Sequence, residues 1–248
     1  MLSVKMLATA FAIATLLSQP VNAGDVTFVT EEYAPFSYTD SDTIKGIAVE
    51  QVHRIAASVG LSYRIEIMPW ARAIALAERQ PDHCVFTTGH NRARDKTFRW
   101  VEPLLKDQMV IVKRKGDKLA ATTLEAAHHQ RVGAQRGDFA VGVLKEHGFT
   151  DIDLAADIAI TLGKLKSGRI DLMPTSVKIY ESMLKDGEPI EKAMLLDGQT
   201  YGIACHKAMP AKTIVAMQNA LDELISSGQQ DAIFTAYGLP PNTRTASR

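Results

Sequence analysis

The chain has 248 residues, with 28 lysines and arginines against 28 aspartates and glutamates, and 46% of its residues are hydrophobic. A neutral chain lacks the surplus of basic residues that nucleic-acid binding requires, so no nucleic-acid partner is expected. The apolar share is too high for intrinsic disorder, and the length allows one large domain or two modest ones. Two cysteines allow at most one internal disulfide, which excludes a disulfide-stapled miniprotein.

The first 23 residues have the pattern of a secretory signal peptide. Lys5 precedes an apolar run over residues 6–17, Pro20 breaks that run, and small residues surround a predicted cut after Ala23. The alternative is a membrane anchor, but the run is much shorter than the roughly 20 residues that a spanning helix needs. We therefore expect an exported, soluble, periplasmic protein.

Strands and helices alternate in the pattern up to residue 88. Period-2 alternation or short apolar runs predict the strands, helical spacing of apolar residues predicts the helices, and Gly60 and Pro69 mark a helix end and a helix start. This order is typical of a parallel sheet with crossover helices. The predicted strands are 25–30, 61–68 and 84–88, and the predicted helices are 46–60 and 69–79.

A second α/β series follows without a linker rich in proline or serine, so the two parts must be joined by strands or short connections. A tail from Leu239 is expected to be disordered. The predicted strands are 109–112, 131–137, 151–156, 169–176 and 200–207, and the predicted helices are 123–130, 139–148, 160–168, 177–187, 211–227 and 231–238.

The usual enzyme signatures are absent. The sequence has no GxxxxGK[ST], GxGxxG, GxSxG or HExxH motif, so no cofactor is expected. Adjacent His128 and His129 on a polar helix are more typical of a solvated surface than of a zinc site, so no metal is expected either. Cys84 and Cys205 lie on predicted strands and either form a disulfide or remain buried thiols.

The segment from Thr87 to Leu104 carries the strongest signal for a site. Thr87 and Gly89 fall at the carboxyl end of a predicted parallel strand, where open α/β sheets bind ligands. Arg92 and Arg94 follow, and an arginine can hold a carboxylate through two parallel hydrogen bonds. On composition alone, a solvated basic run explains these arginines equally well.

Several motifs occur in a characteristic order along the chain. They are YAPFSY with Lys45-Gly46 and Glu50, PWARAIALAE, the Arg94–Trp100–Pro103 spacing, RVGAQRGD, LKSGRIDLM, YGIACHK and NALDELISSGQQDAIFTAYGL. In order and spacing they resemble the family 3 periplasmic solute-binding proteins, which mainly serve amino-acid ABC importers.

The resemblance implies an α/β, two-lobe type II periplasmic-binding-protein fold. Each lobe would be a mainly parallel sheet flanked by helices, and two hinge strands near residues 103–109 and 199–202 would join the lobes. The implied boundaries are lobe 1 at 24–105, lobe 2 at 106–199, and a return to lobe 1 at 200–248 that includes the disordered tail.

The resemblance also implies roles for individual residues. Arg94 matches the arginine that clamps the ligand carboxylate, with Thr87 and Gly89 supplying hydroxyl and backbone contacts. Tyr33 matches an aromatic residue that stacks on the ligand. Trp70 either adds a second apolar wall or belongs to the core of lobe 1.

The helix start in lobe 2 departs from the family pattern. Gly137, Asp138 and Phe139 match the helix N-terminus that meets the ligand carboxylate, but Asp138 stands where Ser or Thr is usual. Ser176 stands where many members carry the acid that binds the ligand ammonium. Asp138 either caps the helix and turns away or has taken over cation recognition. These departures leave the carboxylate clamp in place, but they argue against a standard free α-amino acid as the ligand.

The sequence therefore predicts a non-enzymatic, monomeric binding protein. It would capture a small polar, carboxylate-bearing ligand, an amino acid or a related compound, by hinge closure, for the membrane subunits of an ABC importer. One alternative is an enzyme on the same scaffold, similar to cyclohexadienyl dehydratases that act on arogenate or prephenate. Asp138 and Glu32 are the cleft-side acids that the sequence offers for it. Another alternative is an orphan binder that feeds a sensor.

Overall fold

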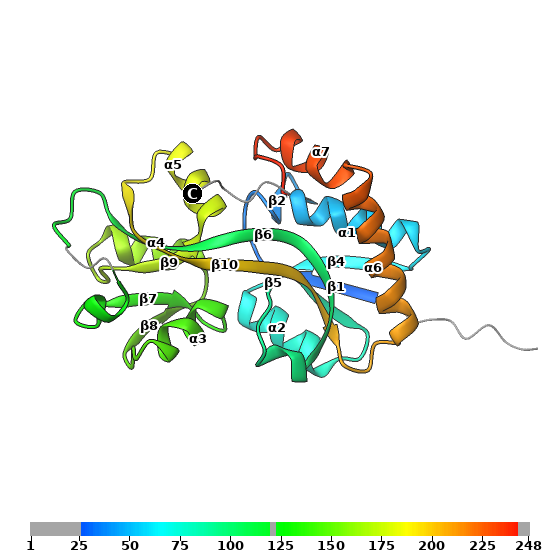
Figure 1. The fold of residues 1–248 in the computed structure, drawn as a ribbon, viewed down its shortest axis with the longest axis horizontal. Coiled ribbons are helices and arrows are strands. Elements are labelled where there is room, and N and C mark those ends of the chain that lie inside the picture. Colours follow the sequence, from blue (N-terminus) through cyan, green and yellow to red (C-terminus); the bar gives the residue numbers. More distant parts are fainter. Residues whose placement is uncertain (1–25, 120–122, 243–248) are drawn as a thin grey trace, which may run out of the picture.

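The computed structural model describes residues 26–119 and 123–242, so the expected signal peptide and its cut after Ala23 lie outside the described residues. The chain forms two lobes connected by two long strands, β6 (Phe98–Arg114) and β10 (Ile190–His206), which run through both lobes (Figure 1). Lobe 1 carries the helices α1 (Ile47–Ser58), α2 (Trp70–Arg79), α6 (Ala211–Ser226) and α7 (Gln229–Ala236). Lobe 2 carries the helices α3 (Phe139–Glu146), α4 (Ile158–Lys166) and α5 (Val177–Lys185).

The strands form a six-stranded mixed sheet in the order β4-β1-β5-β10-β6-β9. Strand β1 pairs in parallel with β4 and β5, as the β-α-β-α-β order predicts, whereas β10 pairs antiparallel with β5 and β6. The bounds of the shorter strands are β1 (Val26–Thr30), β4 (Tyr63–Ile67), β5 (His83–Gly89) and β9 (Met173–Ser176). The lobe boundaries expected at 105/106 and 199/200 fall inside β6 and β10.

Lobe 2 has its own parallel pair, β7 (Val132–Gln135) and β8 (Ile152–Ala155). A parallel bridge between Val132 and Leu172 joins this pair to the chain just before β9, and β9 itself pairs antiparallel with β6. The carboxyl ends of β1 and β5 in lobe 1 and of β7 in lobe 2 carry the residues that line the cavity between the lobes.

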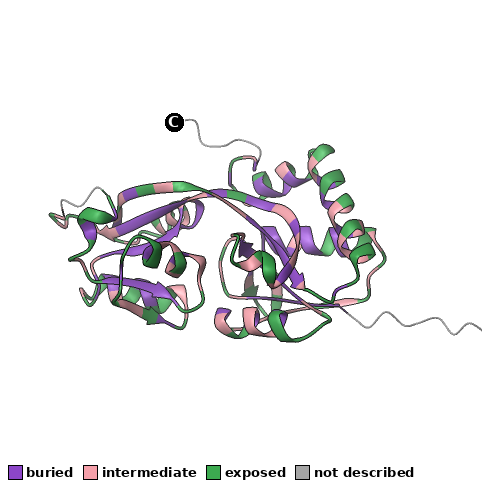
Figure 2. Cartoon of the chain, turned by 60° about the horizontal axis from the view of Figure 1, so that its bottom comes forward, coloured by how far each residue is buried: buried purple, intermediate pink, exposed green. Residues whose placement is uncertain are grey.

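The core of lobe 1 forms where amphipathic helices cover the sheet. Helix α1 buries Ile47, Val52 and Ile55, whose spacing places them on one face. Helices α6 and α7 return to the same cluster through Met217 and Phe234. Each such side chain contributes about 1.5–3 kcal/mol through the apolar area that it buries. Figure 2 shows the buried strands running between helices whose outer faces are exposed.

Several expected elements differ in the structure. The helix expected at 123–130 is only one 3₁₀ turn, η2 (Glu125–Ala127). The strand expected at 169–176 is confined to β9, because the preceding residues turn to hydrogen-bond with Arg131. A short hairpin of β2 (Tyr38–Asp40) and β3 (Thr43–Lys45) follows the YAPFSY segment and was not expected.

The expected disordered tail begins with an ordered stretch. Leu239 and Asn242 are buried. The Asn242 side chain accepts a hydrogen bond from the backbone N–H of Lys106 and donates one to Gln230. These bonds fasten the end of the described chain to lobe 1 beside β6, whereas residues 243–248 lie outside the described residues.

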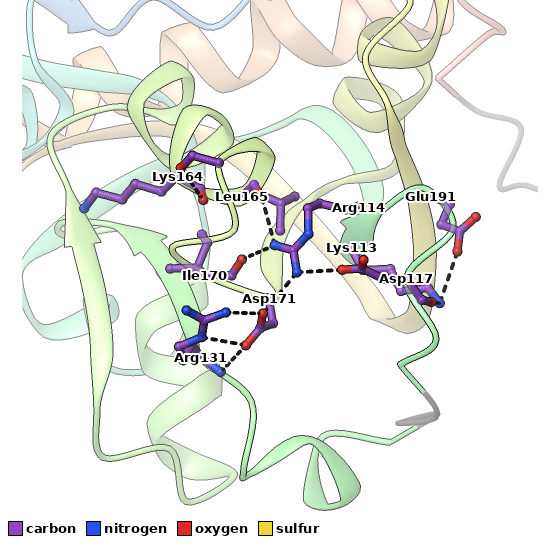
Figure 3. A network of polar contacts seen from close by, with 10 residues as sticks. Lys113, Arg114, Asp117, Arg131, Lys164, Leu165, Ile170, Asp171 and Glu191 are labelled. Atoms are coloured by element: carbon purple, nitrogen blue, oxygen red, sulfur yellow. Dashed lines mark hydrogen bonds and ion pairs between the residues drawn. The ribbon is translucent and has the colours of Figure 1, made fainter.

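A polar network braces the far side of lobe 2 (Figure 3). The Asp171 carboxylate forms ion pairs with Arg131 at 2.7 Å and with Arg114 at 3.1 Å. Arg114 also donates to the carbonyl oxygens of Leu165 and Ile170, so it joins β6 to the end of α4. The hydrogen bonds from Arg131 hold the pKa of Asp171 at about 2, which keeps the network charged at neutral pH.

Cys84 and Cys205 form a buried disulfide that joins β5 to β10, which settles the alternative left open by the sequence. None of the helices in the described ranges has the length and apolar character of a membrane span.

Candidate functional site

A cavity lies between the two lobes and contains about 640 Å³ of space not filled by atoms, part of it open to solvent. The eight residues that the sequence predicts to bind the ligand all line it, so residues far apart in the chain meet at one place: Tyr33, Trp70, Thr87, Gly89, Arg94, Asp138, Phe139 and Ser176.

Arg94 is held in place by its own loop. It begins the 3₁₀ turn η1 (Arg94–Lys96), and its backbone N–H donates to Asn91 Oδ1 at 3.0 Å. Its guanidinium donates to the carbonyl oxygen of Gly89 at 2.7 Å and to that of Gly137 at 3.0 Å. Burial lowers the Arg94 pKa and the charge of Asp138 raises it, but an arginine remains protonated at any physiological pH. The site therefore holds a fixed positive charge.

Thr87 and Gly89 occupy the end of β5 with unusual backbone requirements. Thr87 has a φ of 57°, a left-handed conformation that is costly for a β-branched residue. A side chain at position 89 would collide with the Gln199 side chain, which approaches the Gly89 backbone closely. Strain of this kind is retained where function requires a particular backbone position.

Asp138 caps α3, the first of the two readings that the sequence left open. Its Oδ1 accepts a 2.6 Å hydrogen bond from the Ala140 backbone N–H. Asp138 also lines the cavity, where burial raises its pKa although the bond to Ala140 and the charge of Arg94 oppose the rise. It therefore contributes a negative potential to the cavity while its carboxylate is already used by the helix.

Ser176, like Asp138, both caps a helix and lines the cavity. Its hydroxyl caps α5 by accepting a hydrogen bond from the Ile179 N–H at 3.2 Å, and it lines the cavity. A neutral serine that is used as a cap cannot supply the negative charge that an ammonium group needs.

The aromatic residues form walls on the lobe 1 side. Trp70 is buried in a core cluster with Val85 and Phe98, and its Nε1 also donates to the Gly137 carbonyl oxygen at 2.9 Å. Trp70 therefore belongs to the core of lobe 1 and also lines the cavity. Tyr33 stacks on Phe36 with ring centroids 6.1 Å apart. Its hydroxyl is buried, which raises its pKa and keeps it neutral.

Glu31 is the main residue that the sequence analysis missed. The acid expected in the cleft, Glu32, is exposed and accepts hydrogen bonds from the Thr39 backbone and hydroxyl, so Glu32 is a wrong assignment. Glu31 lines the cavity instead, and its carboxylate accepts a hydrogen bond from Gln135 Nε2 on lobe 2. Burial raises the Glu31 pKa to about 8, with smaller contributions from Asp138 and Asp157.

A positional signal for these missed residues does exist. Glu31 follows β1 and Gln135 ends β7, as Thr87 and Gly89 end β5, so the strand-end rule applies to all of them.

Three buried polar atoms of the cavity have no hydrogen-bond partner among the described residues. They are Thr87 Oγ1, Thr175 Oγ1 and Gln199 Oε1. Buried polar atoms are normally paired, because an unpaired one costs about 1–3 kcal/mol. The three atoms can accept hydrogen bonds from a polar molecule in the cavity.

The described residues contain no group of three or more His, Cys, Asp and Glu side chains arranged to hold a metal ion. His128 belongs to a different surface, where it hydrogen-bonds the carbonyl oxygen of His147.

Residues 26–240 match the family model of bacterial extracellular solute-binding proteins, family 3, and the chain belongs to this family. No curated protein matches the chain in sequence.

Solved structures share the fold at low sequence identity. An ArgBP mutant from T. maritima has a TM-score of 0.79 and 20% identity, covering 87% of this chain and 95% of that one. A histidine kinase sensor domain with similarity to periplasmic binding proteins has a TM-score of 0.80 and 18% identity, covering 88% and 98%. The amino acid ABC transporter substrate-binding protein AbpA of Streptococcus pneumoniae, bound to L-arginine, has a TM-score of 0.78 and 17% identity, covering 86% and 94%. These likenesses establish the type II periplasmic-binding-protein fold.

Proposed function

We propose that this protein is a non-enzymatic, monomeric periplasmic binding protein that captures a small, polar, carboxylate-bearing solute, an amino acid or a related compound, and delivers it to an ABC importer. The observation that carries the proposal is that Arg94 lines the same cavity as three unpartnered polar atoms, Thr87 Oγ1, Thr175 Oγ1 and Gln199 Oε1. A fixed guanidinium suits a carboxylate, and the unpaired atoms suit further polar groups of the same ligand.

Contacts between the lobes support a closing mechanism. Trp70 and Arg94 of lobe 1 both donate to the Gly137 carbonyl oxygen of lobe 2, and Gln135 of lobe 2 donates to Glu31 of lobe 1. A ligand that touches both lobes would add to these contacts in the closed form only, and would shift the population toward it. The hinge would lie within β6 and β10, with lobe 1 at 24–105 and 200–248 and lobe 2 at 106–199.

Family membership supports transport as the purpose of binding. Solute-binding family 3 and the named neighbours include proteins of amino acid ABC transporters. A signal peptide over residues 1–23 would export the chain to the periplasm. The structurally similar histidine kinase sensor domain shows that the same fold also serves signalling. If this protein fed a sensor, ligand capture would be unchanged and only the partner would differ.

The test is a panel of amino acids, opines, polyamines and small carboxylates in a thermal shift assay, followed by calorimetry on every compound that raises the melting temperature. We expect at least one carboxylate-bearing compound to bind with a micromolar-class Kd. Native mass spectrometry of freshly purified protein checks for a co-purified ligand. A panel without any response, together with an empty native spectrum, would overturn the proposal.

An enzyme on this scaffold remains a second candidate because of Glu31. A buried carboxyl with a pKa of about 8 is protonated at neutral pH and could act as a general acid. Among the described residues its side-chain hydrogen-bond partner is Gln135, which is not a base. Turnover of prephenate, followed by absorbance, would favour the enzyme, and its absence under conditions where the protein binds a ligand would favour the binding protein.

A further inference from the structure

One hydrogen bond between the lobes involves a group that can gain or lose a proton near neutral pH. Glu31 follows β1 in lobe 1, and its carboxyl accepts from Gln135 Nε2 at the end of β7 in lobe 2. Gln135 is buried and also donates to the Ala156 carbonyl oxygen of its own lobe. The Glu31 carboxyl is therefore enclosed only while the lobes are together, and separating them would expose it to water.

The charged groups that face Glu31 from lobe 2 have the same sign as its carboxylate. Asp138 begins α3 and Asp157 begins α4, and the charges of both raise the pKa of Glu31. Each is a helix cap that accepts a backbone N–H of its own helix, so both move with lobe 2. Closing the lobes therefore brings acidic groups of opposite lobes together.

The ionisable groups on the lobe 1 side do not offset this repulsion. Tyr33 lies two residues along the same loop, and burial raises the pKa of its hydroxyl, so it stays neutral. Arg94 is the cation among the described residues that line the cavity, and the charges that act on it are those of Asp138 and Glu78. Glu31 forms no ion pair within the described ranges.

Closing the lobes therefore makes the ionised form of Glu31 unfavourable. Burial is the largest cause that raises its pKa from 4.5 to about 8, and the hydrogen bond from Gln135 opposes the rise. With the lobes apart, hydration would return the carboxyl toward its ordinary pKa.

A group whose pKa differs between two conformations makes their equilibrium depend on pH. The closed form has the higher Glu31 pKa, so it is the form that holds the additional proton. This advantage of the closed form is complete below pH 4.5 and is lost as pH rises through about 8.

The neighbouring contacts between the lobes do not depend on pH in this range. Arg94 and Trp70 both donate to the Gly137 carbonyl oxygen. The guanidinium stays protonated and the indole N–H does not ionise, so both donors are unchanged. Ionisation of Glu31 thus acts against a constant set of contacts.

We propose that Glu31 is a proton switch for closure of the unliganded protein: the lobes close while its carboxyl is protonated and separate when it ionises. The inference concerns the empty protein, so it goes beyond the proposed function and does not depend on which ligand binds.

The first test follows the distance between the lobes by single-molecule fluorescence energy transfer between pH 5.5 and 9.5, on protein that native mass spectrometry shows to be free of ligand. The dyes are attached at Arg79→Cys in α2 and Lys145→Cys in α3, two exposed positions on helices of opposite lobes (Figure 1). Cys84 and Cys205 are joined in the buried disulfide, so they do not react with the dyes. We expect the ratio of closed to open protein to fall at least about tenfold between pH 6 and pH 9.

The second test adds Glu31→Gln, with Glu32→Gln as the matched control. Glutamine has nearly the shape of the protonated acid and cannot ionise, so Glu31→Gln should keep the closed distance over the whole range. Glu32 is the adjacent acid, and its carboxylate is exposed and bonded to Thr39 outside the cavity. Glu32→Gln should therefore open with rising pH as the wild type does.

The outcomes decide between a switch and a passive carboxyl. A wild-type distance that does not change with pH, or a Glu31→Gln variant that opens as the wild type does, would overturn the proposal. Circular dichroism shows whether Glu31→Gln is folded. If it is not, carbon-13 NMR of the Glu31 carboxyl in the wild type decides: titration near pH 8 together with opening supports the switch, and titration near pH 4.5 overturns it.

These measurements use no ligand, so their failure is distinct from failure of the proposed function. A protein that opens with rising pH but binds no compound of the panel keeps the switch and loses the proposed function. A protein that binds a compound but whose empty form does not respond to pH keeps the proposed function and loses the switch.

Discussion

Arg94 Nη2 donates a 3.0 Å hydrogen bond to the carbonyl oxygen of Gly137, which belongs to the opposite lobe. The same guanidinium donates to the Gly89 carbonyl oxygen of its own lobe. Two of its five N–H donors are thus used, and the others are available to a ligand. Arg94 therefore both fastens the lobes together and presents its charge to the cavity.

Replacing Arg94 with alanine should abolish ligand binding without unfolding the protein. The side chain lies at the surface of the cavity and does not belong to a core cluster, so we expect the loss of stability to be at most about 2 kcal/mol. Calorimetry with a ligand of the wild type, and a thermal melt without ligand, measure the two effects.

The matched control for this variant is Arg92→Ala. Arg92 is exposed and makes no hydrogen bond or ion pair with the described residues, so binding should be unchanged. A normal Kd for Arg94→Ala would remove Arg94 from the site.

Trp70→Phe should weaken binding about 3- to 10-fold. It keeps an aromatic wall but removes the Nε1 hydrogen bond to Gly137, which is worth roughly 1 kcal/mol in the closed form. Ligand-induced changes in tryptophan fluorescence provide a second measurement, because Trp70 lines the cavity and Trp100, the other tryptophan, does not. The fluorescence change should persist in Trp100→Phe and disappear in Trp70→Phe, and the reverse pattern would contradict the assignment.

Much of the fold could be predicted because apolar periodicity fixes local structure. The spacing of apolar residues predicted helix α1 and strand β1, and the structure buries members of both patterns, such as Ile55 in α1 and Phe28 in β1. The apolar pattern predicts strand β6 only over residues 109–112, because Pro103 interrupts the pattern and prolines seldom lie inside strands. The hinge strand near residues 103–109 was expected only from the resemblance. In the structure, residues 102–104 face only Gly202 across a register shift, so Pro103 lies in a bulge where no ladder hydrogen bond is lost.

The site could be predicted only where a motif fixed the position. Arg94 and Tyr33 were found through the resemblance, and strand-end placement pointed to Thr87. Glu31 and Glu32 are adjacent acids in one loop, and only the turn closed by the Tyr33–Ser37 hydrogen bonds decides which of them faces the cavity. The hydrogen bond between Glu31 and Gln135 joins the two lobes, and local sequence patterns do not predict how the lobes are arranged relative to each other.

Thr87→Gly should stabilise the unliganded protein and weaken binding. Glycine adopts a φ of 57° without strain, so we expect a gain of about 1 kcal/mol in the free energy of unfolding. The substitution also removes the unpartnered Oγ1 from the cavity, which should cost a ligand hydrogen bond and raise Kd several-fold. Thr87→Ser is the control because it keeps the hydroxyl. Denaturant melts measure the free energy of unfolding, and calorimetry measures Kd. A lower free energy of unfolding, or an unchanged Kd, would contradict the prediction.

Removing the disulfide should destabilise the protein by about 2–5 kcal/mol. The bond joins Cys84 and Cys205 across a separation of 121 residues, and both side chains are fully buried in lobe 1. The double substitution of Cys84→Ala and Cys205→Ala should lower the urea midpoint to about that of the reduced wild type. Neither the double variant nor the reduced wild type has the cross-link. A midpoint equal to that of the oxidised wild type would contradict a stabilising role.

The loop that carries Arg94 should become less stable as pH rises through neutrality, because His90 braces it. The His90 ring stacks on Trp100 and hydrogen-bonds with Asp95 at 2.5 Å and Glu102 at 2.9 Å. Burial lowers the His90 pKa, but the bonds to the two carboxylates outweigh it and place the pKa above its ordinary value of 6.5. A raised folded-state pKa stabilises the protein fully below pH 6.5. That contribution is lost as pH rises through the folded pKa. His90→Gln should therefore be less stable than the wild type at about pH 6 and approach it at about pH 8, as measured by urea unfolding at each pH. A stability difference that stays constant between these two values would show that the charge of His90 does not brace the loop.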